Sequence, residues 1–293
     1  MAEAEHDRPI GLNIDLDGST SVAAADLALE SLDARSWGPR LRMLAREADI
    51  ERFYEEVQPR LRPLTLFGSG DFHHLSALWL RRLEEPFTLV MFDNHPDWDR
   101  RPPRWSCGGW LNRALELPSC RRIVVLGCAN FELEYPSRLF GRTDPRLEIH
   151  PWKKAVSRRI AEKYRCLEPD GLPQAAAELG AGLGGQALYV SIDLDAFQAG
   201  QAVTNWEPGL FSLDQVASIV QKLGTDARLL GGDICGCYSV PVFERTLQRV
   251  ADNWDHPKLD LPDPAVIAER NALAVRTLWN ALAEVLDRPR LGD

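Results

Sequence analysis

The most constraining feature of this chain is an apolar run, residues 87–90, that is followed closely by the motif Asp-x-His-x-Asp. The run is typical of a buried strand. In an extended segment every second residue lies on the same face, so Asp93, His95 and Asp97 can point into one pocket. Carboxylates with an imidazole and no thiolate favour Mn, Fe, Co or Zn over Cu(I) or an iron–sulfur cluster. The alternative is an ordinary polar turn after a strand.

Two more predicted strands end in residues of the same chemistry. A strand at 187–192 precedes Asp193 and Asp195, and a short strand followed by a loop precedes His73 and His74. In open parallel α/β sheets, ligands bind outside the carboxyl ends of the strands. Carboxylates gathered this closely repel one another, and two divalent cations would neutralise most of their charge. The sequence therefore predicts a centre of two metal ions about 3.5–4 Å apart.

Strand-like and helix-like segments alternate along the whole chain. The segments expected to be strands are 9–16, 64–67, 87–90, 122–127, 147–150, 187–192 and 228–234. The segments expected to be helices are 21–32, 38–58, 75–83, 107–116, 153–164, 173–180, 212–223 and 265–286. This alternation predicts a parallel sheet covered by helices on both faces. Because no linker rich in proline, glycine or serine divides the sequence, we expect a single domain over residues 1–293.

Composition and charge exclude some classes of function. The 293 residues carry a net charge of −9, which disfavours a sequence-independent nucleic-acid binder. No apolar run approaches the roughly 18 residues of a membrane span, and the acidic stretch 1–8 lacks the apolar region of a signal peptide. We therefore expect a cytoplasmic protein that acts on a small molecule and binds neither nucleic acid nor membrane.

The six cysteines include no C-x-x-C pair, which suits reduced thiols. Cys235 and Cys237 are separated by a single glycine. We favour the interpretation that they are small residues packed at the end of a strand. The alternative is a pair that binds a soft metal or undergoes redox chemistry.

Three motifs make the sequence similar to the arginase–agmatinase–formiminoglutamase superfamily, the ureohydrolases. Residues 93–97 match the family's Asp-x-His-x-Asp, and residues 191–195 match its Ser-x-Asp-x-Asp. The segment 70–76 stands where the family has Gly-Gly-Asp-His. Ungapped, it aligns His73 with the family's metal histidine, whereas a shift by one residue would select His74; we favour His73. The resemblance covers about residues 60–285, and the first 60 residues match weakly.

The resemblance implies a three-layer α/β/α fold with a parallel sheet of about eight strands, and two Mn²⁺ ions per chain. It implies that one ion is held by His73, Asp93, Asp97 and Asp193. It implies that the other ion is held by Asp93, His95, Asp193 and Asp195. In the family, a hydroxide shared by the two ions attacks the planar carbon of a guanidinium or amidine group, and Asp97 would orient it. Relatives often form trimers or hexamers, so a homo-oligomer is a further expectation.

The sequence departs from the arginase pattern in the loop after the third motif. Arginases have a Pro-Gly-Thr-Gly loop there, whereas this chain has a different one, in which we expect Asn205, Trp206 and Glu207 to contact the substrate. The glutamate that pairs with the guanidinium in arginases is matched by Gly236. Glu207 or Glu244 could substitute for it.

The proton-shuttle histidine of arginases also has no counterpart, since residues 100–120 contain no histidine. We expect His74 to supply the proton, with His150 as the alternative. Three functional hypotheses follow. The first is a dinuclear manganese hydrolase of guanidino, amidine or formimino compounds. The others are a metal-bound binding or regulatory protein without ureohydrolase activity, and a single-zinc amidohydrolase like the deacetylases of the same fold, with His73 and His74 as acid and base.

Overall fold

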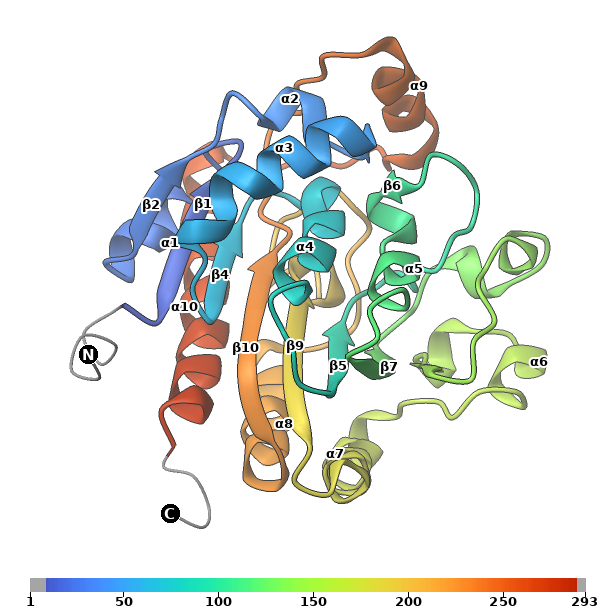
Figure 1. Ribbon diagram of the computed structural model, residues 1–293. Helices are drawn as coiled ribbons and strands as arrows, with labels where there is room; N and C mark the ends of the chain where they lie inside the picture. Colours follow the sequence, from blue (N-terminus) through green and yellow to red (C-terminus); the bar gives the residue numbers. More distant parts are fainter. Residues whose placement is uncertain (1–8, 289–293) are drawn as a thin grey trace.

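A computed structural model describes residues 9–288 and contains an eight-stranded parallel sheet (Figure 1). The order of its strands is β2-β1-β4-β10-β9-β5-β7-β8. Their bounds are Gly11–Asp15 (β1), Glu30–Asp33 (β2), Leu64–Phe67 (β4), Phe87–Phe92 (β5), Cys120–Leu126 (β7), Leu147–His150 (β8), Ala187–Asp193 (β9) and Arg228–Cys235 (β10). A separate antiparallel pair consists of β3 (Leu44–Ala45) and β6 (Trp105–Ser106). The predicted fold class is confirmed; the acidic stretch 1–8 lies outside the described residues.

Helices cover both faces of the sheet and enclose a hydrophobic core on each (Figure 1). The first core packs under α1 (Ser21–Asp26), α7 (Leu172–Leu183), α8 (Leu213–Asp226) and α10 (Pro264–Leu286). The second core packs under α2 (Gly38–Leu41), α3 (Glu47–Val57), α4 (Ser76–Leu80), α5 (Leu111–Ala114) and α6 (Arg158–Ala161). One further helix, α9 (Thr246–Asp255), lies beyond the carboxyl ends of the strands (Figure 1).

The central strands are apolar along their whole length because both of their faces are buried. In β9, Leu188, Val190 and Ile192 point into the first core, and Tyr189 points into the second. All seven residues of this strand are buried. Continuous burial explains why the run reads clearly as a strand from sequence.

Local side-chain chemistry sets the start of two helices. Ser212 Oγ accepts a hydrogen bond from the Gln215 backbone at 3.2 Å, and Gln215 Oε1 accepts one from the Ser212 backbone at 2.8 Å. This capping box starts α8. Asp263 Oδ1 accepts a hydrogen bond from the Ala265 backbone at 2.8 Å, with Pro264 at the first helical position of α10.

The predicted helices at the N-terminal side are wrong in part. The helix expected at 21–32 ends at Asp26, and residues 30–33 form the edge strand β2. This strand pairs only with β1, so its residues alternate between half-buried and exposed and lack the apolar run of a central strand. The helix expected at 38–58 is interrupted by Met43, whose φ of 60° is incompatible with a helix. Helix α9 was not predicted.

The sheet order brings the predicted ligand strands together. Strands β4, β10, β9 and β5 are consecutive neighbours, and all run parallel. Their carboxyl ends therefore meet at one edge, which faces α9 in Figure 1. Among the described residues, no helix is long and apolar enough to cross a membrane.

Candidate metal centre

His73 lies at the centre of a first group of carboxylates. Its Nδ1 atom is 3.0 Å from Asp93 Oδ2, 3.2 Å from Asp97 Oδ2 and 3.4 Å from Asp193 Oδ2. All four side chains are buried. They come from the 3₁₀ segment Gly70–Leu75 after β4 and from the ends of β5 and β9. The arrangement is a cluster of one nitrogen and three oxygens facing one point.

His95 forms a second group beside the first. Its Nδ1 atom lies 2.8 Å from Asp195 Oδ2 and 3.5 Å from Asp93 Oδ1. Asp93 therefore faces both histidines, with one oxygen directed to each group. Three residues that could hold a metal ion meet here, namely Asp93, His95 and Asp195. The carboxylate of Asp93 joins the two groups.

Backbone amides hold the carboxylates in place. The His95 amide donates to Asp93 Oδ1 at 2.6 Å, and the Asp195 amide donates to Asp193 Oδ1 at 3.0 Å. Asp97 has a φ of 42°, a left-handed conformation that aspartate tolerates better than most residues. Its Oδ2 atom accepts a hydrogen bond of 2.6 Å from Trp110 Nε1. Short-range turn geometry thus orients each ligand after its strand ends.

A hydrogen-bond chain fixes the tautomer of His73. Ser191 Oγ donates to Asp233 Oδ1 at 2.7 Å and lies 2.9 Å from His73 Nε2. Because the Ser191 hydroxyl donates its hydrogen bond to Asp233, it accepts one from the Nε2–H of His73, so in the neutral imidazole the Nδ1 lone pair faces the carboxylates. Tyr189 and Ser76 also donate to Asp233, which holds that carboxylate rigidly. This is the outer arrangement expected around a ligating histidine.

The electrostatics of the cluster favour a cation. Burial raises the pKa of Asp97 to about 7, with a further contribution from the charge of Asp93. Burial also raises the pKa of Asp193 and Asp195. Burial lowers the pKa of His73, but the facing carboxylates outweigh it and hold that pKa well above its usual value. The same balance raises the pKa of His95, so without a metal the two imidazoles carry protons that neutralise the carboxylates.

The donor set fits a divalent metal ion. Asp93 Oδ2 is buried and accepts no hydrogen bond from the described residues. Carboxylate oxygens and imidazole nitrogens suit Mn²⁺, Fe²⁺ or Zn²⁺. A bound cation would take the place of the protons on His73 and His95. A buried carboxylate oxygen that faces a histidine nitrogen at 3.0 Å without a hydrogen bond suits a shared metal ion.

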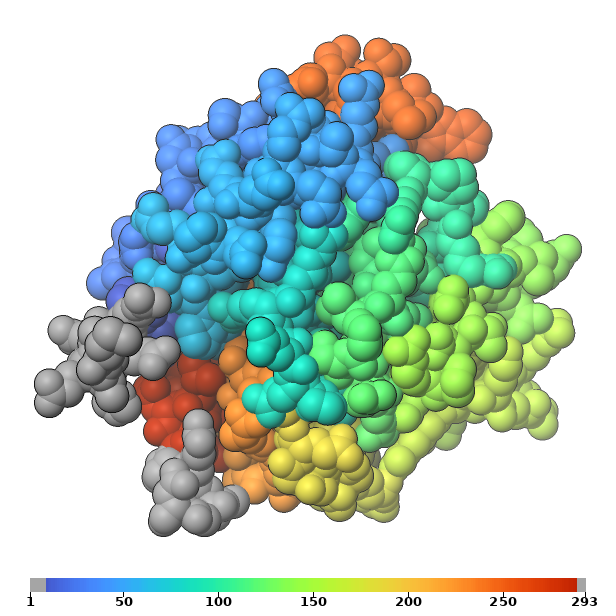
Figure 2. Space-filling model, viewed as in Figure 1, coloured from blue at the N-terminus to red at the C-terminus, as the bar shows by residue number. Residues whose placement is uncertain are grey.

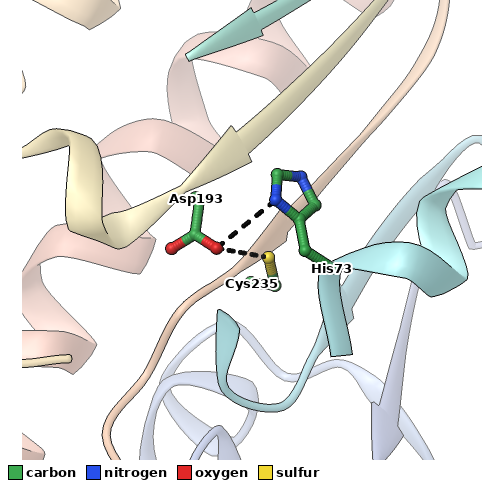
Figure 3. Close-up of side chains that lie close together, drawn as sticks. All are labelled: His73, Asp193 and Cys235. Carbon is green, nitrogen blue, oxygen red and sulfur yellow. Dashed lines mark hydrogen bonds and ion pairs between the residues drawn. The ribbon is translucent and has the colours of Figure 1, made fainter. Parts of the chain in front are cut away.

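A cysteine adjoins this cluster at the end of β10. Cys235 Sγ lies 3.4 Å from Asp193 Oδ2, and Figure 3 shows both side chains beside His73. These three residues offer ligand atoms that lie within 4.8 Å of one another. Cys235 and Cys237 are both buried free thiols. The contact gives Cys235 a place beside the candidate metal ligands.

Two glycines make room for Asp193. A Cβ atom on Gly236 would lie 2.3 Å from Asp193 Oδ1, and one on Gly70 would lie 2.7 Å from Asp193 Oδ2. Gly236 also has a φ of 102°, which side chains with a Cβ rarely adopt. The position that matches the arginase glutamate therefore has no space for a glutamate in this conformation.

The cluster opens into two connected cavities. The inner cavity has a volume of about 40 Å³ and is lined by all six predicted ligands. These are His73, Asp93, His95, Asp97, Asp193 and Asp195. An outer cavity of about 610 Å³ adjoins it, and His95, Glu132 and Trp206 line both. The inner space fits ions and a small reacting group, and the outer space is within the usual size of a ligand pocket.

His74 and His150 lie away from these cavities. The side chain of His74 is fully buried, lines neither cavity, and has no hydrogen-bond partner for either ring nitrogen among the described residues. Burial lowers the pKa of His74 to about 3, so it stays neutral. His150 lies beside the Arg165 carbonyl in a separate cavity. The structure therefore does not bring the predicted proton donor His74, or its alternative His150, to the reacting position.

Only part of the predicted substrate loop lines the outer cavity. Trp206 and Glu207 line the outer cavity, and Glu207 Oε2 is 3.7 Å from His95 Nε2. Asn205 is buried, and its amide exchanges two hydrogen bonds with the Ser239 backbone. Glu244 pairs with Arg40 at the surface. Of the two glutamates expected to replace the arginase glutamate, only Glu207 lies beside the cluster.

Sequence reasoning missed three residues around the site. His256 Nε2 lies 2.7 Å from Asp71 Oδ1, and Arg42 Nη1 lies 2.7 Å from Asp71 Oδ2. Burial raises the pKa of Asp71, but His256 and Arg42 outweigh it and lower that pKa overall. No local pattern marks His256 or Arg42, because their partners are distant in sequence. Glu132 follows the buried strand β7. Its position after a strand end is the sequence feature that could have identified it.

Comparisons with known proteins identify the family of this chain. A family model described as the arginase family matches residues 45–239. A relative from Thermotoga maritima, described as an uncharacterized protein, is 30% identical over 182 residues. That match spans 62% of this chain and 61% of the relative, so the chain covers less than two thirds of the relative's length.

Solved structures share the fold at low sequence identity. Formiminoglutamase of Trypanosoma cruzi with Mn²⁺ has a TM-score of 0.56 and 14% identity, covering 98% of this chain and 97% of that chain. A hypothetical agmatinase from Burkholderia thailandensis has a TM-score of 0.54 and 15% identity, covering 95% and 87%. Arginase from Medicago truncatula has a TM-score of 0.53 and 18% identity, covering 93% and 86%.

Proposed function

The chain belongs to the arginase family, and on this premise we propose that it is a hydrolase that cleaves a non-peptide C–N bond with two Mn²⁺ ions. The proposed substrate is a guanidino, amidine or formimino compound. The observation that carries the proposal is the carboxylate of Asp93, which faces His73 through one oxygen and His95 through the other. A carboxylate shared in this way suits a bridging ligand between two ions.

The proposed ligands divide into two sets that share Asp93 and Asp193. One ion would be held by His73, Asp93, Asp97 and Asp193. The other would be held by Asp93, His95, Asp193 and Asp195. When bound, a pair of such ions supplies an activated water near neutral pH and stabilises developing negative charge.

The protein groups have separate proposed roles around that chemistry. Asp97 is held by Trp110 and would accept a proton at its carboxylate during attack. Glu207, beside His95, would accept hydrogen bonds from the planar cationic group of the substrate. Trp206 lines both cavities and would exclude water from the inner one. Because Gly236 has no space for a side chain, we assign the cation-binding role to Glu207.

The experiment combines metal analysis with a substrate screen. The purified chain is loaded with Mn²⁺, its metal content is measured by mass spectrometry, and release of amine, ammonia, urea or formamide is followed. The expected result is two ions per chain and turnover of at least one guanidino, amidine or formimino compound. The variants Asp195→Asn and His95→Ala should each retain one ion and lose activity by about a thousandfold or more.

Two experimental outcomes would favour an alternative function over this proposal. A single tightly bound zinc would favour the deacetylase-like alternative, although His74 lies outside the cavity and does not support a histidine pair acting there. Two bound ions, ligand-induced thermal shifts and no turnover on any compound would favour a binding or regulatory protein. Oligomeric state and cytoplasmic location stay predictions.

A further inference from the structure

The outer cavity has an apolar wall formed by one face of α9. Leu247, Val250, Ala251 and Trp254 recur at the spacing of a helix face and all line the cavity. The side chain of Trp254 is 85% exposed and that of Leu247 is 62% exposed, although both are large and apolar. Figure 2 shows the segment that contains α9 in orange at the upper edge of the molecule. A face of this kind is unusual on a helix unless something covers it.

Aromatic side chains from other segments also line the cavity, and the guanidinium of Arg101 lies over the ring of one of them, Phe140. Phe131 and Phe140 line the cavity, and their side chains are 67% and 42% exposed. Trp98 and Trp206 line it closer to the metal-ligating residues. Aromatic rings therefore extend from the inner cavity to the outer rim. Rings in this arrangement bind apolar groups and also attract cations through their faces.

Helix α9 is held firmly in this position. The Gln248 side chain is buried and donates to the backbone carbonyl of Arg42 at 2.8 Å and to that of Pro39 at 3.1 Å. At the end of the helix, His256 is bonded to the buried Asp71. The apolar face is therefore fixed toward the cavity rather than exposed by chance on a loose segment.

The charge on the cavity wall is negative. Glu132, Glu207 and Asp255 line it, and none of them forms an ion pair with a lysine or arginine within residues 9–288. Arg101, by contrast, is bonded to Asp99 at 2.7 Å. His95 lies 3.7 Å from Glu207, and His256 is shared between Asp71 and Asp252. Four carboxylates (Asp99, Glu132, Glu207 and Asp255) therefore line the cavity against one arginine.

We propose that the outer cavity binds a cationic substrate that bears an aromatic or long alkyl group and no carboxylate. The proposal rests on the proposed function, since the C–N bond to be cleaved would occupy the inner cavity. The excess of carboxylates over arginine on the cavity wall would attract the cation and repel a substrate carboxylate. The aromatic walls and the α9 face would bury the apolar group, which shields their exposed rings from water.

Calorimetry with three probes tests the substrate class without requiring turnover. The full chain loaded with Mn²⁺ is titrated with phenylbutylamine, butylamine and phenylbutyrate. We expect phenylbutylamine to bind about tenfold or more tightly than butylamine, and phenylbutyrate to bind at least about tenfold more weakly than phenylbutylamine. If phenylbutyrate binds as tightly as phenylbutylamine, or if the phenyl group adds no affinity, the proposal is wrong.

Matched leucine variants test the wall. Leu247→Ala shortens a leucine in the cavity wall, and Leu273→Ala shortens one on α10 that is 52% exposed and away from the cavity. We expect Leu247→Ala and Trp254→Ala to weaken phenylbutylamine about five- to tenfold while butylamine changes less than about twofold. Leu273→Ala should bind like the parent chain. Equal behaviour of the Leu247→Ala and Leu273→Ala variants would overturn the proposal.

Two further measurements separate the possible failures. If Trp254→Ala converts an oligomer into smaller species and leaves probe affinity unchanged, the α9 face is a subunit interface and the substrate proposal fails. If phenylbutylamine binds as expected but phenylbutylguanidine and its amidine analogue are not hydrolysed, the hydrolase function fails and the binding inference stands. If short guanidines are hydrolysed with no preference for a phenyl group, the function stands and this inference fails.

Discussion

At the scale of single residues, space around one carboxylate decides what the site can contain. A Cβ on Gly236 would lie 2.3 Å from Asp193 Oδ1, so the side chain of Asp193, a proposed ligand, leaves no space for the glutamate of the arginases. Restoring the glutamate would displace this proposed ligand.

The variant Gly236→Ala tests this contact. The added Cβ would push against Asp193 and strain a backbone with a φ of 102°. We expect Mn²⁺ affinity to fall by about ten- to a hundredfold, measured by calorimetry. The control is Gly200→Ala, where an added Cβ meets nothing within 4 Å, and its affinity should equal that of the parent chain. An unchanged affinity in Gly236→Ala would show that Asp193 is not a ligand or that the loop adapts.

Protonation of the cluster gives a second prediction at this scale. The pKa of Asp97 is raised from 3.8 to about 7, so the metal-free fold loses stability as pH rises through that interval. The pKa values of His73 and His95 are raised above 6.5, so their stabilising protons are present below pH 6.5 and are lost as pH rises further. Both effects have the same sign.

Thermal unfolding between pH 5.5 and pH 8.5 measures the combined effect. With a chelator present, the unfolding temperature should fall as pH rises. With Mn²⁺ present it should stay level or rise, because deprotonated ligands bind the ion more tightly. A metal-free protein that becomes more stable over this interval would contradict the protonation pattern of the cluster.

At the scale of elements, a buried ion-pair network joins segments that are far apart in sequence. Arg42, just after α2, contacts Asp71 at 2.7 Å and Asp17 at 2.8 Å. Asp71 in turn contacts His256, which follows α9. The 3₁₀ segment that carries His73 is thereby tied to the wall of the outer cavity. The network therefore fixes the position of His73, a proposed ligand, relative to α9, which forms part of the proposed substrate cavity.

Arg42→Met tests this connection. Removal of the guanidinium would leave Asp17 without its cation and Asp71 with His256 alone, so the free energy of unfolding should fall by about 3–5 kcal/mol in chemical denaturation. The matched control is Arg40→Met, because Arg40 pairs with Glu244 at the surface and both side chains are about half exposed. That variant should lose no more than about 1 kcal/mol. Similar losses in the two variants would show that the buried network adds nothing.

At the scale of the whole molecule, the order of the strands creates the site. Strands β4, β9 and β5, which precede the proposed ligands, are far apart in sequence but meet within four neighbouring positions of the sheet. Both hydrophobic cores pack on this same sheet. We propose on this basis that the chain folds as one domain.

The sequence by itself determined the parallel sheet and the residues that gather at its edge. Asp93, His95 and Asp97 could be predicted because their position after a buried strand is a local property, visible as an apolar run followed by polar residues. The same holds for Asp193 and Asp195. Only the tertiary structure decided that His73 faces the cluster and His74 does not, because that depends on the turn of one 3₁₀ segment against β10.

The substrate cavity was likewise decided by tertiary structure. His256 contacts Asp71 across 185 positions of sequence, and α9 reaches the site only because Gln248 bonds to the segment that contains Arg42. Such contacts depend on how loops pack over the sheet. No periodic pattern in either segment indicates that it contacts the other. The edge that carries the proposed metal ligands was therefore determined by local sequence, whereas the proposed substrate cavity was determined by packing between distant segments.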